Sequence, residues 1–264
     1  MARTTFAAYG LVAAALATAF PGAVLATQAP VVLGVSYVEP PHKPGAKVRT
    51  PEGLASPLAD RLAKSLPLKR TAVSAEAIVS RDSPGAASPA DVFLLPLNSE
   101  EAAKVPGTVI PTGYKAGIMA IMRSDTDIRR WEDLRGKTVC LSEGGGLVGQ
   151  IHAQYGAQEK VFRAPADALL DLRIGGCDAT VHDSTMLEAL IQFPEWKKFS
   201  ARLPILQERE LSFIVPDGAA EHTELLRQQV EAWRTELLLP KLTAQAARDI
   251  AFEVYMDQEV PDCH

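Results

Sequence analysis

The sequence predicts an α/β protein with largely parallel sheets. Short apolar runs rich in β-branched residues alternate with segments of helical periodicity along the chain, and strands separated by helices are typical of parallel sheets. The 264 residues, 47% of them hydrophobic, allow one large domain or two smaller ones. The formal net charge is −5, with no run of like charges, so we expect no nucleic-acid partner.

The elements follow in order from an apolar first strand. Residues 31–37, VVLGVSY, predict a strand that ends in a Pro-rich loop. Leucines at positions 54, 58, 62 and 66 recur every four residues and predict a helix with one apolar face. Residues 91–96, DVFLLP, predict a short buried strand, and 80–90 read as a loop.

The same alternation continues to the C-terminal end. Further strands are predicted at 116–122, 137–142, 160–164, 178–182 and 211–216. Helices are predicted at 166–174, 184–193, 223–239 and 243–256.

The N-terminal segment has the composition of a secretory signal peptide. Arg3 is followed by an alanine-rich apolar stretch over 6–20 and by the breaker pair Pro21-Gly22. Cleavage is expected after Ala26, which makes 1–26 the signal peptide and places the mature protein in the periplasm. An uncleaved membrane anchor is the alternative, since the apolar stretch approaches the roughly 20 residues that span a bilayer.

Two motifs in the middle of the chain carry a family resemblance. Residues 131–139 read WEDLRGKTV, and residues 175–183 read GGCDATVHD. With the surrounding stretch 116–191, they resemble the second lobe of amino-acid-type periplasmic solute-binding proteins, the extracellular solute-binding family 3 of ABC transporters. The opening strand at 31–37 and the helix at 54–66 resemble the first lobe of that family more weakly.

The resemblance implies a periplasmic binding protein type 2 fold. Each of its two lobes would hold a mostly parallel sheet flanked by helices, and hinge strands would join the lobes. Lobe 1 would be discontinuous, from 30–113 and 205–264, and lobe 2 would span 114–204. The implied function is a monomeric receptor that captures a small, polar, amino-acid-like solute by hinge closure and delivers it to a membrane-embedded ABC permease.

A glycine-rich turn follows the strand at 137–142. Residues 144–149 match G-x-G-x-x-G with Asp167 further on, but four glycines in six positions satisfy that dinucleotide pattern easily. Such a turn can instead hold an anion on backbone N–H groups. The resemblance favours a ligand carboxylate bound by Ser142, Gly144, Gly145 and Gly146, and a plain strand-to-helix turn is the alternative.

Asp183 is the leading candidate for a binding residue. In the resembled family the aspartate at this position binds the ammonium group of the ligand, and a carboxylate in a closing cleft suits a cationic amine. Asp183 could also serve only as the N-cap of the following helix. We expect the adjacent His182 to be a buried, hydrogen-bonded strand residue.

Lobe 1 offers weaker candidates. Tyr37 and Glu39 end the first strand, where parallel sheets place ligands, although Glu39 could be a solvated loop acid. Asn98 and Ser99 follow the strand at 91–96 and are further ligand-binding candidates.

The family arginine that binds the ligand carboxylate is missing after the strand at 91–96. Glu101 or Ala102 stands there, and Lys104 and Lys115 are the nearest cations. One of these lysines could replace the arginine, or the solute is not an ordinary α-amino acid, or transport binding has been lost.

Cys140 and Cys177 stand where one subgroup of the family, the general L-amino-acid binding proteins, pairs two cysteines. The resemblance therefore implies a disulfide bond, with two free thiols as the alternative, and Cys263 is left unassigned. Metal-site and catalytic motifs are absent from the sequence, so we expect no metal, no cofactor and no enzymatic activity. The alternatives are a non-transporting accessory or sensor protein and a cyclohexadienyl-dehydratase-like enzyme that uses Glu39 or Glu101.

Overall fold

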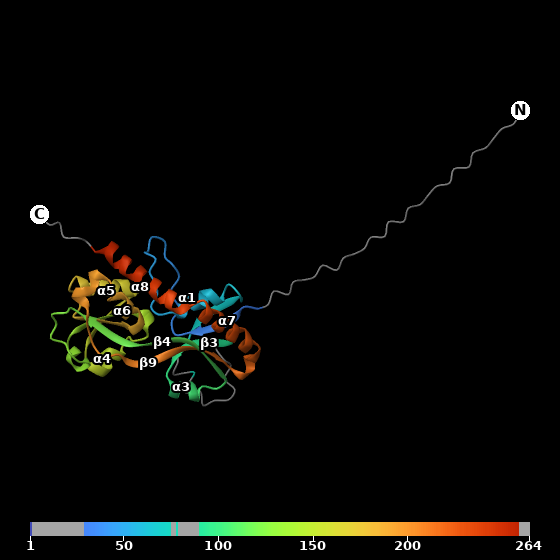
Figure 1. Cartoon of the computed structure of the whole chain (residues 1–264), viewed down its shortest axis with the longest axis horizontal. Coiled ribbons are helices and arrows are strands. Elements are labelled where there is room, and N and C mark those ends of the chain that lie inside the picture. Colours follow the sequence, from blue (N-terminus) through green and yellow to red (C-terminus); the bar gives the residue numbers. More distant parts are fainter. Residues whose placement is uncertain (2–28, 75–77, 79–89, 259–264) are drawn as a thin grey trace.

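The computed structural model describes residue 1, residues 29–74, residue 78 and residues 90–258 (Figure 1). The predicted signal peptide, nearly all of the predicted loop at 80–90, and Cys263 lie outside the described residues. No helix within the described ranges is long and apolar enough to cross a membrane.

One mixed sheet runs through the molecule in the order β2-β1-β3-β9-β4-β7-β5-β6, with β8 beside β4. The strands are Val31–Val35 (β1), Leu68–Ala72 (β2), Val92–Leu97 (β3), Thr108–Met122 (β4), Thr138–Ser142 (β5), Gln158–Phe162 (β6), Ala179–Asp183 (β7), Ala201–Arg202 (β8) and Leu206–Val215 (β9). Each apolar run predicted as a strand overlaps one of these strands.

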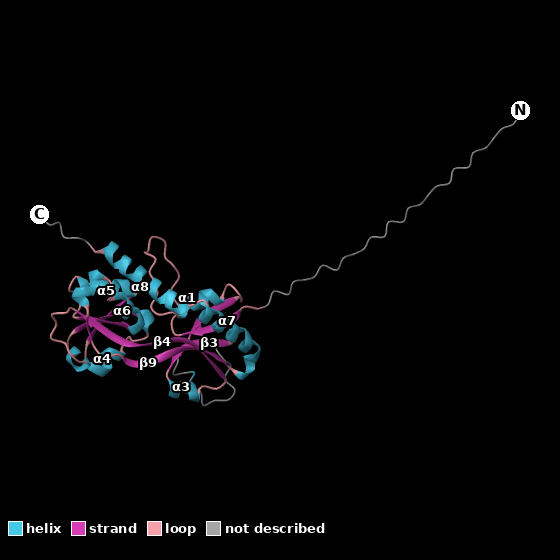
Figure 2. Ribbon diagram, viewed as in Figure 1, coloured by secondary structure: helices cyan, strands magenta, loops and turns pink. Residues whose placement is uncertain are grey.

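Helices flank both halves of the sheet (Figure 2). They are Ala55–Leu62 (α1), Ser99–Lys104 (α3), Gln150–Tyr155 (α4), Pro165–Arg173 (α5), Ser184–Leu190 (α6), Thr223–Thr235 (α7) and Leu238–Asp257 (α8). Within the described residues, 3-10 turns lie at Trp131–Leu134 (η1), Glu143–Gly145 (η2), Pro194–Phe199 (η3) and Asp217–His222 (η4).

The strand directions divide the sheet into two lobes. β1 pairs in parallel with β2 and β3, and β5 pairs in parallel with β6 and β7. β4 and β9 pair antiparallel with each other and pass between the two parallel groups. We call β1–β3 with α1, α3 and α7 the first lobe, and β5–β7 with α4, α5 and α6 the second lobe. The predicted two-lobed α/β fold is confirmed.

Each lobe has its own apolar core. In the first lobe, Leu58 and Leu62 of α1 pack with Leu94, Phe213 and Trp233, as the four-residue leucine spacing predicts. The sheet of the second lobe is covered on both faces. A Met119, Leu169, Leu187 and Trp196 cluster lies on one face, and a Val139, Leu141, Val181 and Ile151 cluster lies on the other.

The last helix, α8, begins earlier than the sequence predicts. The first of the two C-terminal helices was expected to span 223–239, but it ends before Leu237, which has a φ of 52° in the left-handed region. Pro240 therefore lies in the first turn of α8, where its missing N–H would have no intrahelical partner in any case.

α8 packs against both lobes (Figure 1). Leu238, Leu239 and Leu242 at its start join the core of the first lobe. Ile250, Ala251 and Val254 near its end are buried in the cluster of the second lobe that contains α5 and α6. The predicted lobe boundaries at 113/114 and 204/205 stay a prediction, and α8 belongs to neither lobe alone.

This packing makes Ile250 a test of the contact between α8 and the second lobe. We expect Ile250→Ala to lower the free energy of unfolding by about 2–5 kcal/mol, because it leaves a cavity in a fully buried position. Phe252→Ala on the same helix is the control, since Phe252 is 63% exposed and its loss should change stability by less than about 0.5 kcal/mol. Urea denaturation measures both. Equal effects of the two variants would contradict the bridging role.

Candidate functional site

A cavity of about 600 Å³ lies between the two lobes, beside β4. It is within the size range of small-molecule sites. Of the candidates from sequence, those that line it are Tyr37, Glu39, Ser142, Gly144, Gly145, Gly146 and Asp183.

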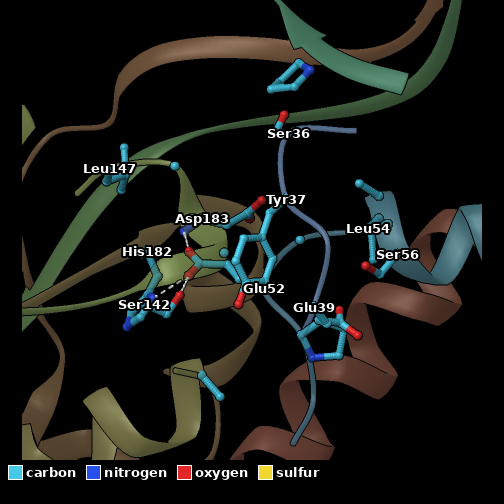
Figure 3. A pocket seen from close by; sticks show the side chains of 18 of the residues that line it. Ser36, Tyr37, Glu39, Glu52, Leu54, Ser56, Ser142, Leu147, His182 and Asp183 are labelled. Atoms are coloured by element: carbon cyan, nitrogen blue, oxygen red, sulfur yellow. Dashed lines mark hydrogen bonds and ion pairs between the residues drawn. The ribbon is translucent and has the colours of Figure 1, made fainter. Parts of the chain in front are cut away.

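The carboxylate of Glu52 lies in the middle of these residues (Figure 3). Glu52 belongs to the loop between β1 and α1 of the first lobe, yet its partners are in the second lobe. Its Oε2 accepts hydrogen bonds from the Ser142 hydroxyl and from His182 Nδ1 at 3.0 Å, and its Oε1 accepts one from the backbone N–H of Asp183 at 2.9 Å. The Glu52 side chain is 4% exposed.

The hydrogen bonds of His182 fix its charge. The Thr180 hydroxyl donates its hydrogen to the carbonyl of Cys140, so it can only accept from His182 Nε2 at 2.8 Å. On the other side, an ionised Glu52 can only accept from Nδ1. Opposite an ionised Glu52, this arrangement of acceptors therefore places a hydrogen on both ring nitrogens of His182. The prediction of a buried, hydrogen-bonded strand histidine is confirmed, because His182 is 0% exposed.

The same partners account for the pKa of Glu52. Burial raises the pKa of its carboxyl, but the charge of His182 and the hydrogen bonds from His182, Ser142 and Asp183 outweigh burial and lower the pKa below its ordinary value. The pair is therefore a buried ion pair with both carboxylate oxygens hydrogen-bonded.

The glycine-rich turn makes room for this carboxylate. A Cβ at Gly145 would lie 2.9–3.0 Å from the Glu52 carboxylate, and one at Gly144 would lie 3.4 Å from the Tyr37 ring. The expectation that Ser142 and the backbone N–H groups of the turn bind a ligand carboxylate stays a prediction. The donors to Glu52 are Ser142, His182 and the Asp183 N–H, and the glycines of the turn allow its close approach.

Asp183 caps a helix and also lines the cavity, and its ligand-binding role stays a prediction. Its Oδ1 accepts from the N–H groups of Thr185 and Met186 at 2.9 and 3.1 Å, so it is the N-cap of α6. Its Oδ2 accepts from the Tyr114 hydroxyl at 2.7 Å, and the residue lines the cavity. Burial raises the pKa of Asp183 to about 6, with the nearby Glu52 adding to the rise and the hydrogen bonds opposing it.

Other contacts tie the loop of Glu52 to the second lobe and to α8. Arg49 pairs with Asp167 of α5 at 2.5 Å and with Asp257 of α8. The backbone N–H and hydroxyl of Thr50 both donate to Glu253, at 2.9 and 2.6 Å. Nearer β1, the Tyr37 hydroxyl donates to Glu143 at 3.1 Å.

Arg209 supplies a cavity-lining cation that the sequence analysis did not identify. It lies on β9, donates to Glu101 Oε1 at 3.1 Å, and has a buried Nε with no partner among the described residues. The lysines considered earlier do not line the cavity, since Lys104 pairs with Glu100 at 2.5 Å and Lys115 lies 3.9 Å from Glu210.

Asn98 and Ser99 lie outside the cavity lining. Asn98 is the N-cap of α3 and forms a capping box with Glu101, whose N–H donates to Asn98 Oδ1 at 2.8 Å. Ser99 is exposed in the first turn of α3. Helix capping occupies the Asn98 side chain, so their ligand-binding role stays an untested prediction.

Cys140 and Cys177 form a disulfide, with their Cα atoms 5.9 Å apart, as the resemblance implied. The bond joins β5 to the turn that precedes β7. An Asp171 carboxylate oxygen lies within 4.8 Å of both sulfur atoms. A disulfide offers no thiolate to an ion, so these three residues are not a metal site in this state.

Comparison with solved structures identifies the architecture. A mutant of ArgBP from T. maritima superposes with a TM-score of 0.51 at 21% identity, over 81% of this chain and 93% of that one. The fold is that of a two-lobed periplasmic binding protein.

Two further structures share this binding-protein fold. The ancestral amino acid-binding protein AncCDT-1, a precursor of cyclohexadienyl dehydratase, gives a TM-score of 0.50 at 17% identity, over 82% of this chain and 94% of that one. A second structure of AncCDT-1, described as an ancestral cationic amino acid solute binding protein, gives 0.51 at 18% over the same shares. No protein-family model matches the sequence, and no curated protein matches it significantly.

The residues that the sequence analysis missed share one property. Arg49 and Glu52 lie in the loop between β1 and α1, and Arg209 lies on a strand whose segment LQEREL has alternating charges. Their partners are distant in sequence, 118 residues away for Arg49 with Asp167 and 130 for Glu52 with His182. The signal available in the sequence for Glu52 was an acidic residue directly before Gly53, in the loop just ahead of α1.

The raised pKa of Asp183 predicts a pH effect on stability. The unfolded carboxyl ionises near 3.8 and the folded one near 6, so the folded state holds the proton more tightly. Its stabilising contribution is present below about pH 4 and is lost as the pH rises through 6, which amounts to about 3 kcal/mol.

In Asp183→Asn this pH-dependent loss is absent, because the amide cannot ionise but can still cap α6. We expect the free energy of unfolding of the variant, relative to wild type, to rise by about 2–3 kcal/mol from pH 4 to pH 7.5 in urea denaturation. Glu188→Gln, an exposed change on the same helix, should show no such trend. If the difference in free energy of unfolding between Asp183→Asn and wild type does not change with pH, the Asp183 carboxyl of the wild type ionises at its ordinary pKa.

Proposed function

We propose that the chain is a periplasmic solute-binding receptor that captures a small amino-acid-like solute, bearing an ammonium and a carboxylate, for an ABC permease. The observation that carries the proposal is the interlobe cavity with the partly buried Asp183 at its wall. Export to the periplasm rests on the N-terminal sequence, and the permease partner rests on the family resemblance.

An ammonium group suits the surroundings of Asp183. The pKa of the Asp183 carboxyl is raised because burial and the nearby Glu52 both disfavour a second negative charge. A bound cation would relieve this penalty and favour the ionised carboxylate, so the cavity gains more from a cationic group than from a neutral one. The Tyr114 hydroxyl holds Asp183 Oδ2 in place.

Arg209 is the proposed partner of the solute carboxylate. Arg209 of β9 pairs with Ala116 of β4, and Asp183 of β7 pairs with Ile118 of β4. The two charged residues therefore flank the same stretch of β4 from opposite sides, on strands about 10 Å apart. A separation of this size leaves room for a small zwitterion between the two charged groups.

The printed descriptions of the similar structures support this solute class. AncCDT-1 is described both as an amino acid-binding protein and as a cationic amino acid solute binding protein. Because Tyr37 comes from the first lobe and Asp183 from the second, a solute that contacts both gains interactions only in the closed form.

A non-transporting accessory or sensor protein is the second candidate. The observation that favours it is Glu52, which already accepts hydrogen bonds from the Ser142 hydroxyl and the Asp183 N–H at the wall of the cavity. An enzymatic role has less support, because Glu101 caps α3 and pairs with Arg209 away from the cavity lining, and Glu39 is exposed at the rim. One similar structure is nevertheless described as a precursor of cyclohexadienyl dehydratase.

Thermal unfolding against a panel of amino acids, amines, opines and organic acids tests the proposal. A solute present at about 100 times its dissociation constant should stabilise the protein by about 2.7 kcal/mol. Asp183→Asn should abolish the shift, and Glu188→Gln should preserve it. Recovery of the solute unchanged supports a receptor, whereas its conversion would mean an enzyme. No shift across the panel would favour the accessory role.

A further inference from the structure

We propose that the second-lobe pocket formed by the Ser142 hydroxyl, the His182 ring and the Asp183 N–H is a carboxylate site that the chain fills with its own Glu52. Glu52 then acts as a built-in ligand that holds the lobes closed without solute. A small carboxylate must displace it to enter. The inference deepens the proposed function, on which it rests for the identity of the cleft.

The pocket has the donor set that a carboxylate requires. Three donors converge on two oxygens, with Ser142 and His182 on Oε2 and the Asp183 N–H on Oε1. Gly145 leaves the approach free, because a Cβ there would meet the carboxylate carbon at 3.0 Å. Every donor belongs to the second lobe, and the acceptor arrives from the first lobe.

The charge of His182 makes the empty pocket unfavourable. His182 is fully buried and carries hydrogen on both ring nitrogens, so without an anion it would be an unpaired buried cation. A buried charge without a partner is costly. The pocket therefore favours exchange of one carboxylate for another over vacancy.

The loop presents Glu52 in a fixed position. Pro51 restricts the backbone before it, and Gly53 follows with a φ of 70° in the left-handed region that glycine tolerates. Arg49 and Thr50 anchor the same loop to α5 and α8. A tethered carboxylate has a high local concentration, so Glu52 occupies the pocket in most molecules. The apparent affinity for a carboxylate in solution is therefore its intrinsic affinity multiplied by the small fraction of molecules in which Glu52 has left the pocket.

Chemical rescue of Glu52→Ala tests the role of Glu52 as a built-in ligand. Propionate, which has the same three carbons and carboxylate as a complete Glu side chain, should raise the melting temperature of Glu52→Ala by about 5 °C at 100 times its dissociation constant. Wild type should not respond, because its pocket is filled. Propionamide, the neutral analogue, should leave both proteins unchanged.

The pocket residues can be tested in the same background. Adding Ser142→Ala to Glu52→Ala removes one donor and should raise the propionate concentration for the half-maximal shift about tenfold. If Glu52→Ala does not fold, Glu52→Gln replaces it, since propionate should displace the neutral amide. An equal response of wild type and variant, or no response of either variant, would overturn the proposal.

Small-angle X-ray scattering measures the closure. The radius of gyration of Glu52→Ala should exceed that of wild type and should return toward it with propionate. Identical values for both proteins would contradict a closing role of Glu52.

The experiments distinguish failure of the built-in-ligand proposal for Glu52 from failure of the proposed receptor function. Propionate has no ammonium group, so its rescue of Glu52→Ala should survive the addition of Asp183→Asn. A solute from the panel should instead depend on Asp183. Rescue by propionate, with no solute of the panel stabilising the protein, supports the built-in-ligand role of Glu52 and weakens the receptor proposal. Stabilisation by a solute, with no rescue by propionate, supports the receptor and contradicts the role of Glu52.

Discussion

The buried ion pair between Glu52 and His182 is the interaction on which the closed structure depends. It joins a loop of the first lobe to a strand of the second and satisfies the hydrogen bonds of Ser142 and the Asp183 backbone at the same time. Removing one partner would leave the other charged and buried, and such losses cost about 3–5 kcal/mol. The positions of the two lobes and the chemistry of the cleft are therefore coupled through one carboxylate.

The remaining links between the lobes have different physical characters. β4 and β9 are continuous strands that pass from one lobe to the other, and α8 packs on both cores. Arg49 adds charge pairs to α5 and α8 that are less buried than the Glu52 contact. Opening the cleft requires the charged contacts to break, while the strands and the helix hold the lobes together.

The sequence predicted the parts of the fold that repeat locally. Strands and helices with clear apolar periodicity were placed correctly. Ser142 and Asp183, which were proposed from the family resemblance, both line the cavity. β2 was missed because its segment LKRTA is charged and only partly buried at the edge of the sheet. Glu52 and Arg209 were missed because their roles depend on partners that only the tertiary structure brings near. Asn98 caps α3 outside the cavity lining, and a helix-capping asparagine looks the same in sequence as a binding one.

The order of the strands also constrains how the chain can fold. In the first lobe, Leu94 of β3 pairs with Phe213 of β9, and Trp233 of α7 completes the core. During synthesis the N-terminal half therefore lacks its closing strand and helix until nearly the whole chain has been made, and non-local pairing of this kind is slow. Until then the apolar residues of β1, β3 and α1 have no complete core in which to be buried.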